Sequence, residues 1–173
     1  MIDIIPIQPG LIESFHRTLD VVARERRYLA FLEAPPIEQT RNFVLDVIEQ
    51  GYSQFVAVAA GEVVGWCDVL PKPRPIYAHS GVLGIGLLPL MRGKGIGMRL
   101  IRQALEAARS FGFSRVELTV RENNQVAITL YEKVGFKMEG LMRRAALIDG
   151  AYENVALMAL LFETSATKSA SAS

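Results

Sequence analysis

The stretch PLMRGKGIGM, residues 89–98, decides the fold of this chain. It follows a short apolar run, residues 81–88, which predicts a strand buried on both faces. It leads into residues 95–111, whose apolar side chains recur at helical spacing. The first turn of a helix has free N–H groups and a partial positive charge, and glycines there let an anion approach the backbone. The stretch therefore predicts a phosphate cradle between a strand and a helix.

Two common phosphate-binding motifs are excluded. A Walker A loop needs a glycine ahead of its Gly-Lys pair and a hydroxyl residue after it, but Leu88 and Gly95 stand at those positions. The dinucleotide pattern G-x-G-x-x-G fails because residue 98 is Met98. What remains is the pattern Arg92-x-x-Gly95-x-Gly97.

Outward from this turn, hydrophobic periodicity and turn residues predict the remaining elements. The expected strands are residues 2–7, 54–60, 62–69, 81–88, 115–120, 136–148 and 152–162, and the expected helices are residues 11–29, 36–51, 95–111 and 124–134. This order indicates an α/β or α+β fold around one mixed sheet. Residues 1–163 are expected to form a single domain, and the small-residue run 164–173 is expected to be a flexible tail.

Composition narrows the function. Nineteen Lys and Arg against 18 Asp and Glu give a formal net charge of +1, which argues against a broad nucleic-acid-binding face. The single cysteine, Cys67, and two distant histidines exclude the usual metal sites, so no metal is expected. No apolar run approaches the roughly 20 residues of a membrane span, and no export signal is evident at the start. We expect no membrane partner and a cytoplasmic location.

The turn resembles a signature of the GNAT superfamily of acyl-CoA-dependent N-acetyltransferases, Arg-x-x-Gly-x-Gly after a buried strand. A second motif agrees, because residues 124–136, NQVAITLYEKVGF, are similar to that superfamily's Asn-x-x-Ala-x-x-Leu-Tyr-x-x-x-Gly-Phe helix. The resemblance covers roughly residues 2–162 and implies a mostly antiparallel sheet of about seven strands flanked by about four helices. Residues 79–86 and 139–150 resemble the branch that acetylates small molecules or protein N-termini.

The resemblance implies acetyl-CoA as the acyl donor. Its pyrophosphate would lie on the backbone N–H groups of Gly93, Lys94, Gly95, Ile96, Gly97 and Met98, with Arg92 beside them. Its pantetheine arm would pair with Gly86, Leu87 and Leu88, and glycines at 84 and 86 suit a bulge that splays the strand. Asn124 would contact the cofactor or cap its helix, and Lys133 would reach the phosphates or remain a solvated position.

Tyr131 matches the superfamily's general acid, which protonates the leaving thiolate, although core packing is an alternative role. The general base is less evident, because Thr119 and Val82 stand where related enzymes carry glutamates. Glu117 shares a strand face with Thr119, and His79 titrates near neutrality, so both are candidates. A water chain or a backbone carbonyl is a further alternative. Cys67 is expected to be a buried structural thiol.

The expected activity is direct transfer of an acetyl group to a primary amine of a small molecule or amino acid. A protein N-terminus is an alternative acceptor, and a non-catalytic acyl-CoA-binding module is an alternative function. The acceptor is expected near Tyr28, Phe31 and Glu33, where the first two helices join. The apolar strand 155–162 makes a homodimer another expectation.

Overall fold

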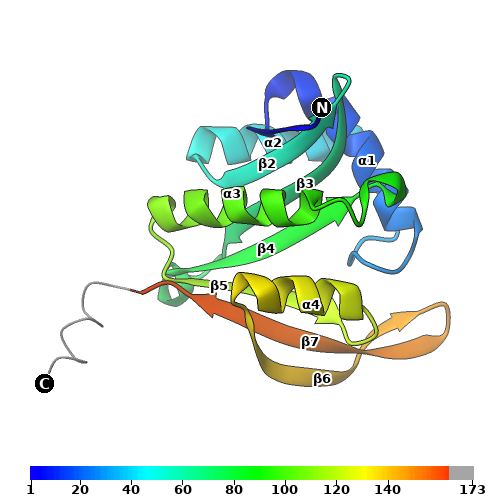
Figure 1. Cartoon of the computed structure of the whole chain (residues 1–173), viewed down its shortest axis with the longest axis vertical. Helices are drawn as coiled ribbons and strands as arrows, with labels where there is room; N and C mark the ends of the chain where they lie inside the picture. The colour runs from blue at the N-terminus through cyan, green and yellow to red at the C-terminus, as the bar shows by residue number, and fades with distance from the viewer. Residues whose placement is uncertain (164–173) are drawn as a thin grey trace, which may run out of the picture.

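A computed structural model of the chain describes residues 1–163, so the predicted tail, residues 164–173, lies outside the described residues. Its core is a seven-stranded sheet with the order β1-β2-β3-β4-β5-β7-β6 (Figure 1). The strands are β1 (Asp3–Pro6), β2 (Ser53–Ala59), β3 (Glu62–Pro71), β4 (Ser80–Leu87), β5 (Arg115–Arg121), β6 (Lys137–Ile148) and β7 (Ala151–Leu161). Only the β4–β5 pair is parallel, which confirms the expected mixed, mostly antiparallel sheet.

Four α-helices cover the sheet, two on each face (Figure 1). They are α1 (Ile12–Arg24), α2 (Ile37–Gln50), α3 (Ile96–Phe111) and α4 (Gln125–Val134). Apolar side chains of α3 and α4 form one core with the odd-numbered residues of β4 and the even-numbered residues of β5. Residues of α1 and α2 form a second core on the opposite face, around Trp66 of β3. The chemistry of each strand residue therefore depends on which of these two faces it occupies.

The end of α1 differs from the prediction. Apolar spacing continues to Leu29, but the helix ends at Arg24, and Arg26 has a left-handed backbone with φ 58°. Leu29 still packs against the α1–α2 core, which explains why its spacing looked helical. Residues 25–36 thus form a loop between α1 and α2 that lies beside the sheet rather than extending the helix.

The prediction that β4 is buried on both faces is wrong for the face shared with α1 and α2. On that face Val82 is 39% exposed and Gly84 is half-buried. The expected bulge at Gly84 and Gly86 is also absent, since β3 and β4 pair without a register shift from Gly65–Leu87 to Pro71–Gly81. Gly86 is needed for another reason, because a Cβ there would lie 2.2 Å from the Trp66 ring.

The two halves of the sheet separate between β4 and β5. Their pairing begins at Ser80–Arg115 and stops at Val82–Glu117, so the second half of β4 has no partner strand on that side. A gap lined by backbone groups therefore opens toward the start of α3. Within residues 1–163, no helix is long and apolar enough to cross a membrane.

Candidate active site

The glycine-rich turn forms an open, electropositive helix start. Gly93 and Gly95 have left-handed backbones, with φ 74° and 79°, and no atom lies within 4 Å of where their Cβ atoms would be. The first helical hydrogen bond of α3 runs from the Arg99 N–H to the Gly95 carbonyl, at 3.2 Å. The N–H groups of residues 96–98 consequently have no helical acceptor, and neither a side-chain cap nor an acidic residue occupies this end. This geometry suits a pyrophosphate lying on the backbone.

Arg92 is committed to protein partners rather than to a phosphate. Its guanidinium donates to both carboxylate oxygens of Glu25, at 2.8 and 2.6 Å, and to the Leu87 carbonyl, at 3.1 and 2.7 Å. It also lies over the Tyr28 ring, 4.6 Å from the centroid. Its side chain therefore braces the turn against β4 and the end of α1, and its place beside the pyrophosphate stays a prediction. We call this set of contacts the Arg92 brace.

The register of β3 and β4 determines which backbone groups of β4 point into the β4–β5 gap. The Leu88 N–H donates to the Val64 carbonyl, so alternation directs the backbone groups of Gly86 toward β3 and those of Ile85 and Leu87 toward the gap. The Leu88 carbonyl accepts from the Met91 N–H. The backbone groups of Gly86 and Leu88 that bond to β3 and to Met91 are thus already satisfied within the protein, and their pairing with the pantetheine arm stays a prediction. The free groups are those of Ile85 and the N–H of Leu87.

Tyr131 is a residue of α4, and its side chain points into the core that α3 and α4 form with the sheet. It is 7% exposed and packs against Phe136, with ring centroids 5.9 Å apart. Burial, and secondarily the neighbouring Cys67, raise the pKa of its phenol, so the hydroxyl stays protonated at neutral pH. Cys67 is fully buried, and burial likewise raises the pKa of its thiol, as expected for a structural cysteine.

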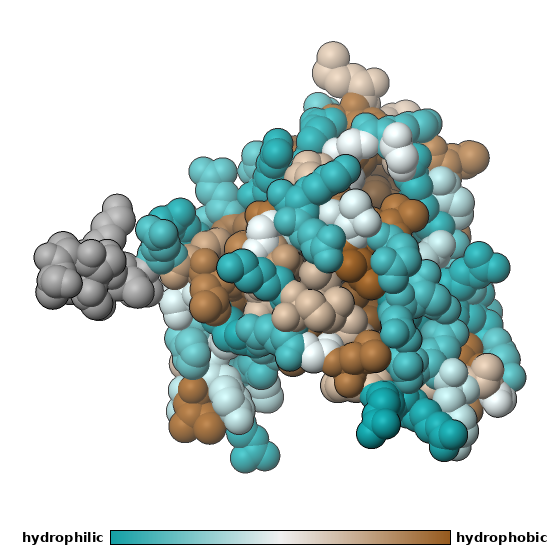
Figure 2. Space-filling view, turned by 60° about the horizontal axis from the view of Figure 1, so that its bottom comes forward, coloured by the Kyte–Doolittle hydropathy of each residue, from teal (hydrophilic) through white to brown (hydrophobic). Residues whose placement is uncertain are grey.

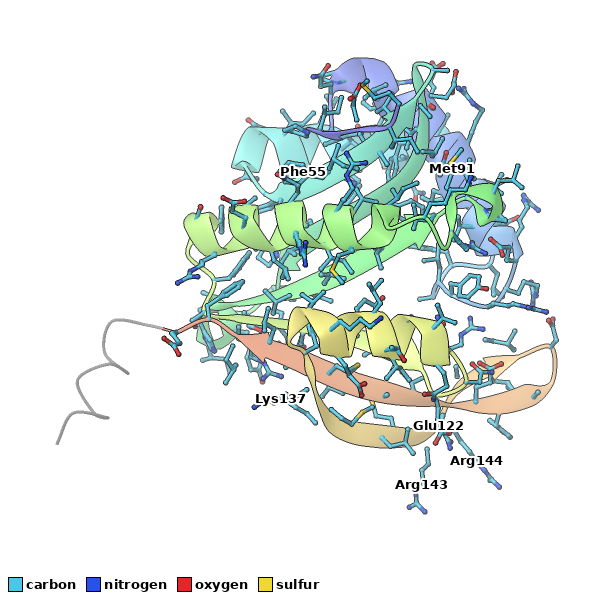
Figure 3. The ribbon with its side chains drawn as sticks, in the orientation of Figure 1. Phe55, Met91, Glu122, Lys137, Arg143 and Arg144 are labelled. Carbon is cyan, nitrogen blue, oxygen red and sulfur yellow. The ribbon has the colours of Figure 1, made fainter. Side chains whose placement is uncertain are left out.

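The remaining predicted cofactor residues lie nearby. The Asn124 Oδ1 accepts from the Ala127 N–H at 3.2 Å, so this side chain caps α4. Lys94 and Lys133 are exposed. Figure 3 shows Met91 in the turn that leads into α3.

Neither predicted base is well placed. The Glu117 carboxylate is held by Lys72 Nζ at 2.7 Å and by Arg115 at 3.1 Å. Burial alone would raise the pKa of Glu117, but these two cations lower it, so the group remains ionised and binds a proton weakly. His79 is exposed and precedes β4, roughly 16 Å along the strand from Gly84 at about 3.3 Å per residue. The geometry therefore disfavours both residues as the base.

Asp68 and Gln54 are polar residues that the sequence reasoning did not select. Both lie inside the sheet on the face shared with α1 and α2, and they are 8% and 2% exposed. Burial raises the pKa of Asp68 to about 7, against a smaller opposing effect of the Gly84 backbone amide. The sequence contained one signal for Asp68, because it is the single charged residue within the apolar run 63–70.

The α1–α2 loop borders the same face and is fixed to it. Arg121 of β5 donates to the carbonyls of Arg26 and Leu29, at 2.6 and 3.0 Å, and Arg26 forms a bidentate pair with Asp149 of the β6–β7 turn. The predicted acceptor residues Tyr28 and Phe31 are on this loop, 39% and 53% exposed. The third, Glu33, pairs with Arg24 at 3.3 Å. Figure 2 shows one face of the molecule, turned by 60° from the view of Figure 1, on which hydrophobic residues are scattered among hydrophilic ones.

Among residues 1–163, no group of three or more His, Cys, Asp or Glu side chains is arranged to hold a metal ion. The functional groups that the site presents are the helix start, the backbone of β4, and the buried Tyr131 and Asp68.

Comparisons with known proteins agree with this geometry. The profile of the Acetyltransferase (GNAT) family matches residues 18–136. The L-amino acid N-acetyltransferase AaaT of Escherichia coli is 34% identical over 63% of this chain and 68% of its own length. The N-alpha-acetyltransferase RimI of Mycobacterium tuberculosis is 38% identical over 55% of this chain and 58% of its own length.

Solved structures show the same architecture. A GNAT-family acetyltransferase from Streptococcus pneumoniae superposes with a TM-score of 0.88 at 26% identity, covering 94% of this chain and all of the other. A phosphinothricin acetyltransferase from Sinorhizobium meliloti, solved with acetyl-CoA, has the same fold, with a TM-score of 0.88 at 21% identity over 95% of this chain and 91% of the other. The chain belongs to the GNAT family of acetyl-CoA-dependent N-acetyltransferases.

Proposed function

We propose that this protein acetylates the primary amino group of a free amino acid or a similarly small amine. The observation that carries this proposal is the fixed α1–α2 loop beside the open face of β4 and β5. Because Arg121 and the Arg26–Asp149 pair hold the loop from two sides, the acceptor face is bounded at that end. A bounded face favours a small acceptor over a long peptide.

The printed names of relatives support the same class. Besides AaaT, the L-methionine sulfoximine/L-methionine sulfone acetyltransferase of Pseudomonas aeruginosa is 30% identical over 64% of this chain and 66% of its own length. RimI is the specific reason to keep a peptide N-terminus as the second candidate.

In the proposed reaction the pyrophosphate of acetyl-CoA lies on the N–H groups of residues 96–98. The backbone of Ile85 and Leu87 orients the pantetheine arm and the thioester in the β4–β5 gap. The Tyr131 hydroxyl, kept protonated by its burial, donates a hydrogen bond to the departing sulfur, and its proton transfers as charge builds there. A neutral amine attacks from the face of the α1–α2 loop.

A thiol-release assay with acetyl-CoA tests the proposal. Its acceptors are the free L-amino acids, L-methionine sulfone, simple alkylamines, and hexapeptides that begin with alanine or serine. We expect kcat/KM for at least one amino acid or small amine to exceed that of every peptide by about tenfold or more. Faster turnover of the peptides would replace the proposal with N-terminal acetylation.

A further inference from the structure

Three residues form a cross-strand row on the acceptor face of the sheet: Gln54 of β2, Asp68 of β3 and Gly84 of β4. The register pairs Gln54 with Asp68 and Asp68 with Gly84. The Ile7 N–H donates to the Gln54 carbonyl, so the backbone of Gln54 bonds toward β1 and its pair with Asp68 is of the non-hydrogen-bonded type. In such a pair the side chains lie closest, with Cα atoms about 4.5 Å apart.

The polar side chains of this row have few partners within the fold. Both amide atoms of Gln54 are buried and have no hydrogen-bond partner among the described residues. The Asp68 carboxylate, in a residue that is only 8% exposed, has the Gly84 backbone amide as its partner. Buried polar side chains nearly always have partners, so this row is arranged for a ligand or an ordered water.

Gly84 connects the row to the donor site. A Cβ at this position would lie 3.1 Å from Asp68 Oδ1, so glycine leaves the space over β4 to the carboxylate. The next residue, Ile85, presents its backbone to the gap where the thioester is proposed to lie. Val82, two residues before Gly84 on the same face, is 39% exposed, so an acceptor can reach the row from solvent.

The charged groups facing Asp68 pair with one another instead. Lys72, which directly follows β3, bonds to Glu117 of β5, and at the end of α1 Glu25 pairs with Arg92. Gln54 on β2 and Gly84 on β4 carry no charge. Desolvation is consequently the main effect on Asp68, and it raises the pKa of this carboxyl to about 7.

We propose that the Asp68 carboxylate is the general base that takes a proton from the acceptor's ammonium group, beside the unpaired amide of Gln54. This inference rests on the proposed function for its reaction but not for the identity of the amine. The nitrogen lone pair freed by Asp68 forms the C–N bond at the thioester carbon, and the C–S bond then breaks. The nitrogen then loses its second proton to solvent, and Tyr131 gives its proton to the leaving sulfur and takes one back from solvent. Asp68 releases the first proton to solvent, so the products are the amide, the CoA thiol and one proton.

The test is the pH dependence of kcat/KM in the full chain, with saturating acetyl-CoA and two acceptor probes, L-methionine sulfone and a hexapeptide beginning with alanine. For the better probe, we expect the wild-type kcat/KM to rise with a midpoint near pH 7 and to reach a plateau above about pH 8. Asp68→Asn should lower kcat/KM about 100-fold or more at pH 7. It should also lose the rise of kcat/KM around pH 7, which we call the limb. The deficit should shrink as pH approaches the amine's own pKa, because the amine then arrives neutral.

Two controls separate catalysis from folding and from the choice of acceptor. Glu117→Gln removes another carboxylate from the same face and should keep the limb near pH 7. The acetyl-CoA-induced rise in melting temperature should persist in Asp68→Asn, which would show an intact donor site. An Asp68→Asn enzyme that retains the limb or most of its activity overturns the role of Asp68, whichever probe is used. Preference for the peptide overturns only the proposed acceptor class.

Discussion

Asp68→Asn should change how the free energy of unfolding depends on pH. A carboxyl whose pKa is about 7 in the folded protein and 3.8 when unfolded holds its proton more tightly in the folded state. Its ionisation therefore costs the folded state nothing below about pH 4, and the cost grows as pH rises and levels off above about pH 7. The linkage relation gives about 2 kcal/mol at pH 5 and about 4 kcal/mol at pH 8.

Asparagine has no such ionisation, so the variant should gain stability over the wild type as pH rises. The difference in free energy of unfolding should grow by about 2–3 kcal/mol between pH 5 and pH 8, or about 5–10 °C in melting temperature for a chain of this length. Thermal unfolding followed by circular dichroism at pH 5, 6, 7 and 8, without acetyl-CoA, measures it. Asp46→Asn, at an exposed position on α2, is the matched control and should parallel the wild type. A wild-type-to-Asp68→Asn difference that stays constant within about 0.5 kcal/mol would refute the buried ionisation.

Three further predictions test the site. Tyr131→Phe should lower kcat at least about tenfold while the acetyl-CoA-induced melting shift is unchanged; loss of the shift would assign the residue to cofactor packing instead. Gly95→Ala and Gly112→Ala, at the left-handed start and end of α3, should each cost about 1–2 kcal/mol of stability, but only the former should weaken acetyl-CoA binding in calorimetry. Glu25→Gln breaks a half-buried bidentate pair with Arg92 and should lower the free energy of unfolding in urea by about 1–2 kcal/mol. Glu33→Gln breaks an exposed pair and should change it by less than about 0.5 kcal/mol, and equal effects would contradict the importance of burial.

Sequence reasoning succeeded where the determining contacts are local. The left-handed glycines of the turn, the free N–H groups of α3 and the capping of α4 by Asn124 all depend on residues within one helical turn. The succession of helices and strands along the chain also followed from the two motifs and the alternation of apolar residues. Here a short window of sequence contains nearly all of the relevant physics.

It failed where partners are distant in the chain. The carboxylate that occupies Arg92 is 67 residues away, and the carbonyls bound by Arg121 are 95 and 92 residues away. Asp68 becomes notable only when the register places Gln54 and Gly84 beside it. Periodicity cannot provide the register, because sliding a strand by two residues keeps each of its side chains on the same face but changes its cross-strand partners.

The Arg92 brace has a consequence for the order of events in catalysis. One guanidinium joins the phosphate-binding turn, the Leu87 carbonyl at the edge of the gap, and Glu25 at the start of the α1–α2 loop. Because of these shared contacts, we expect an adjustment of the turn on binding acetyl-CoA to be transmitted to the loop that borders the acceptor. By thermodynamic reciprocity, the factor by which the donor changes acceptor affinity equals the factor by which the acceptor changes donor affinity. We thus expect each of the two substrates to change the binding affinity of the other before the reaction takes place.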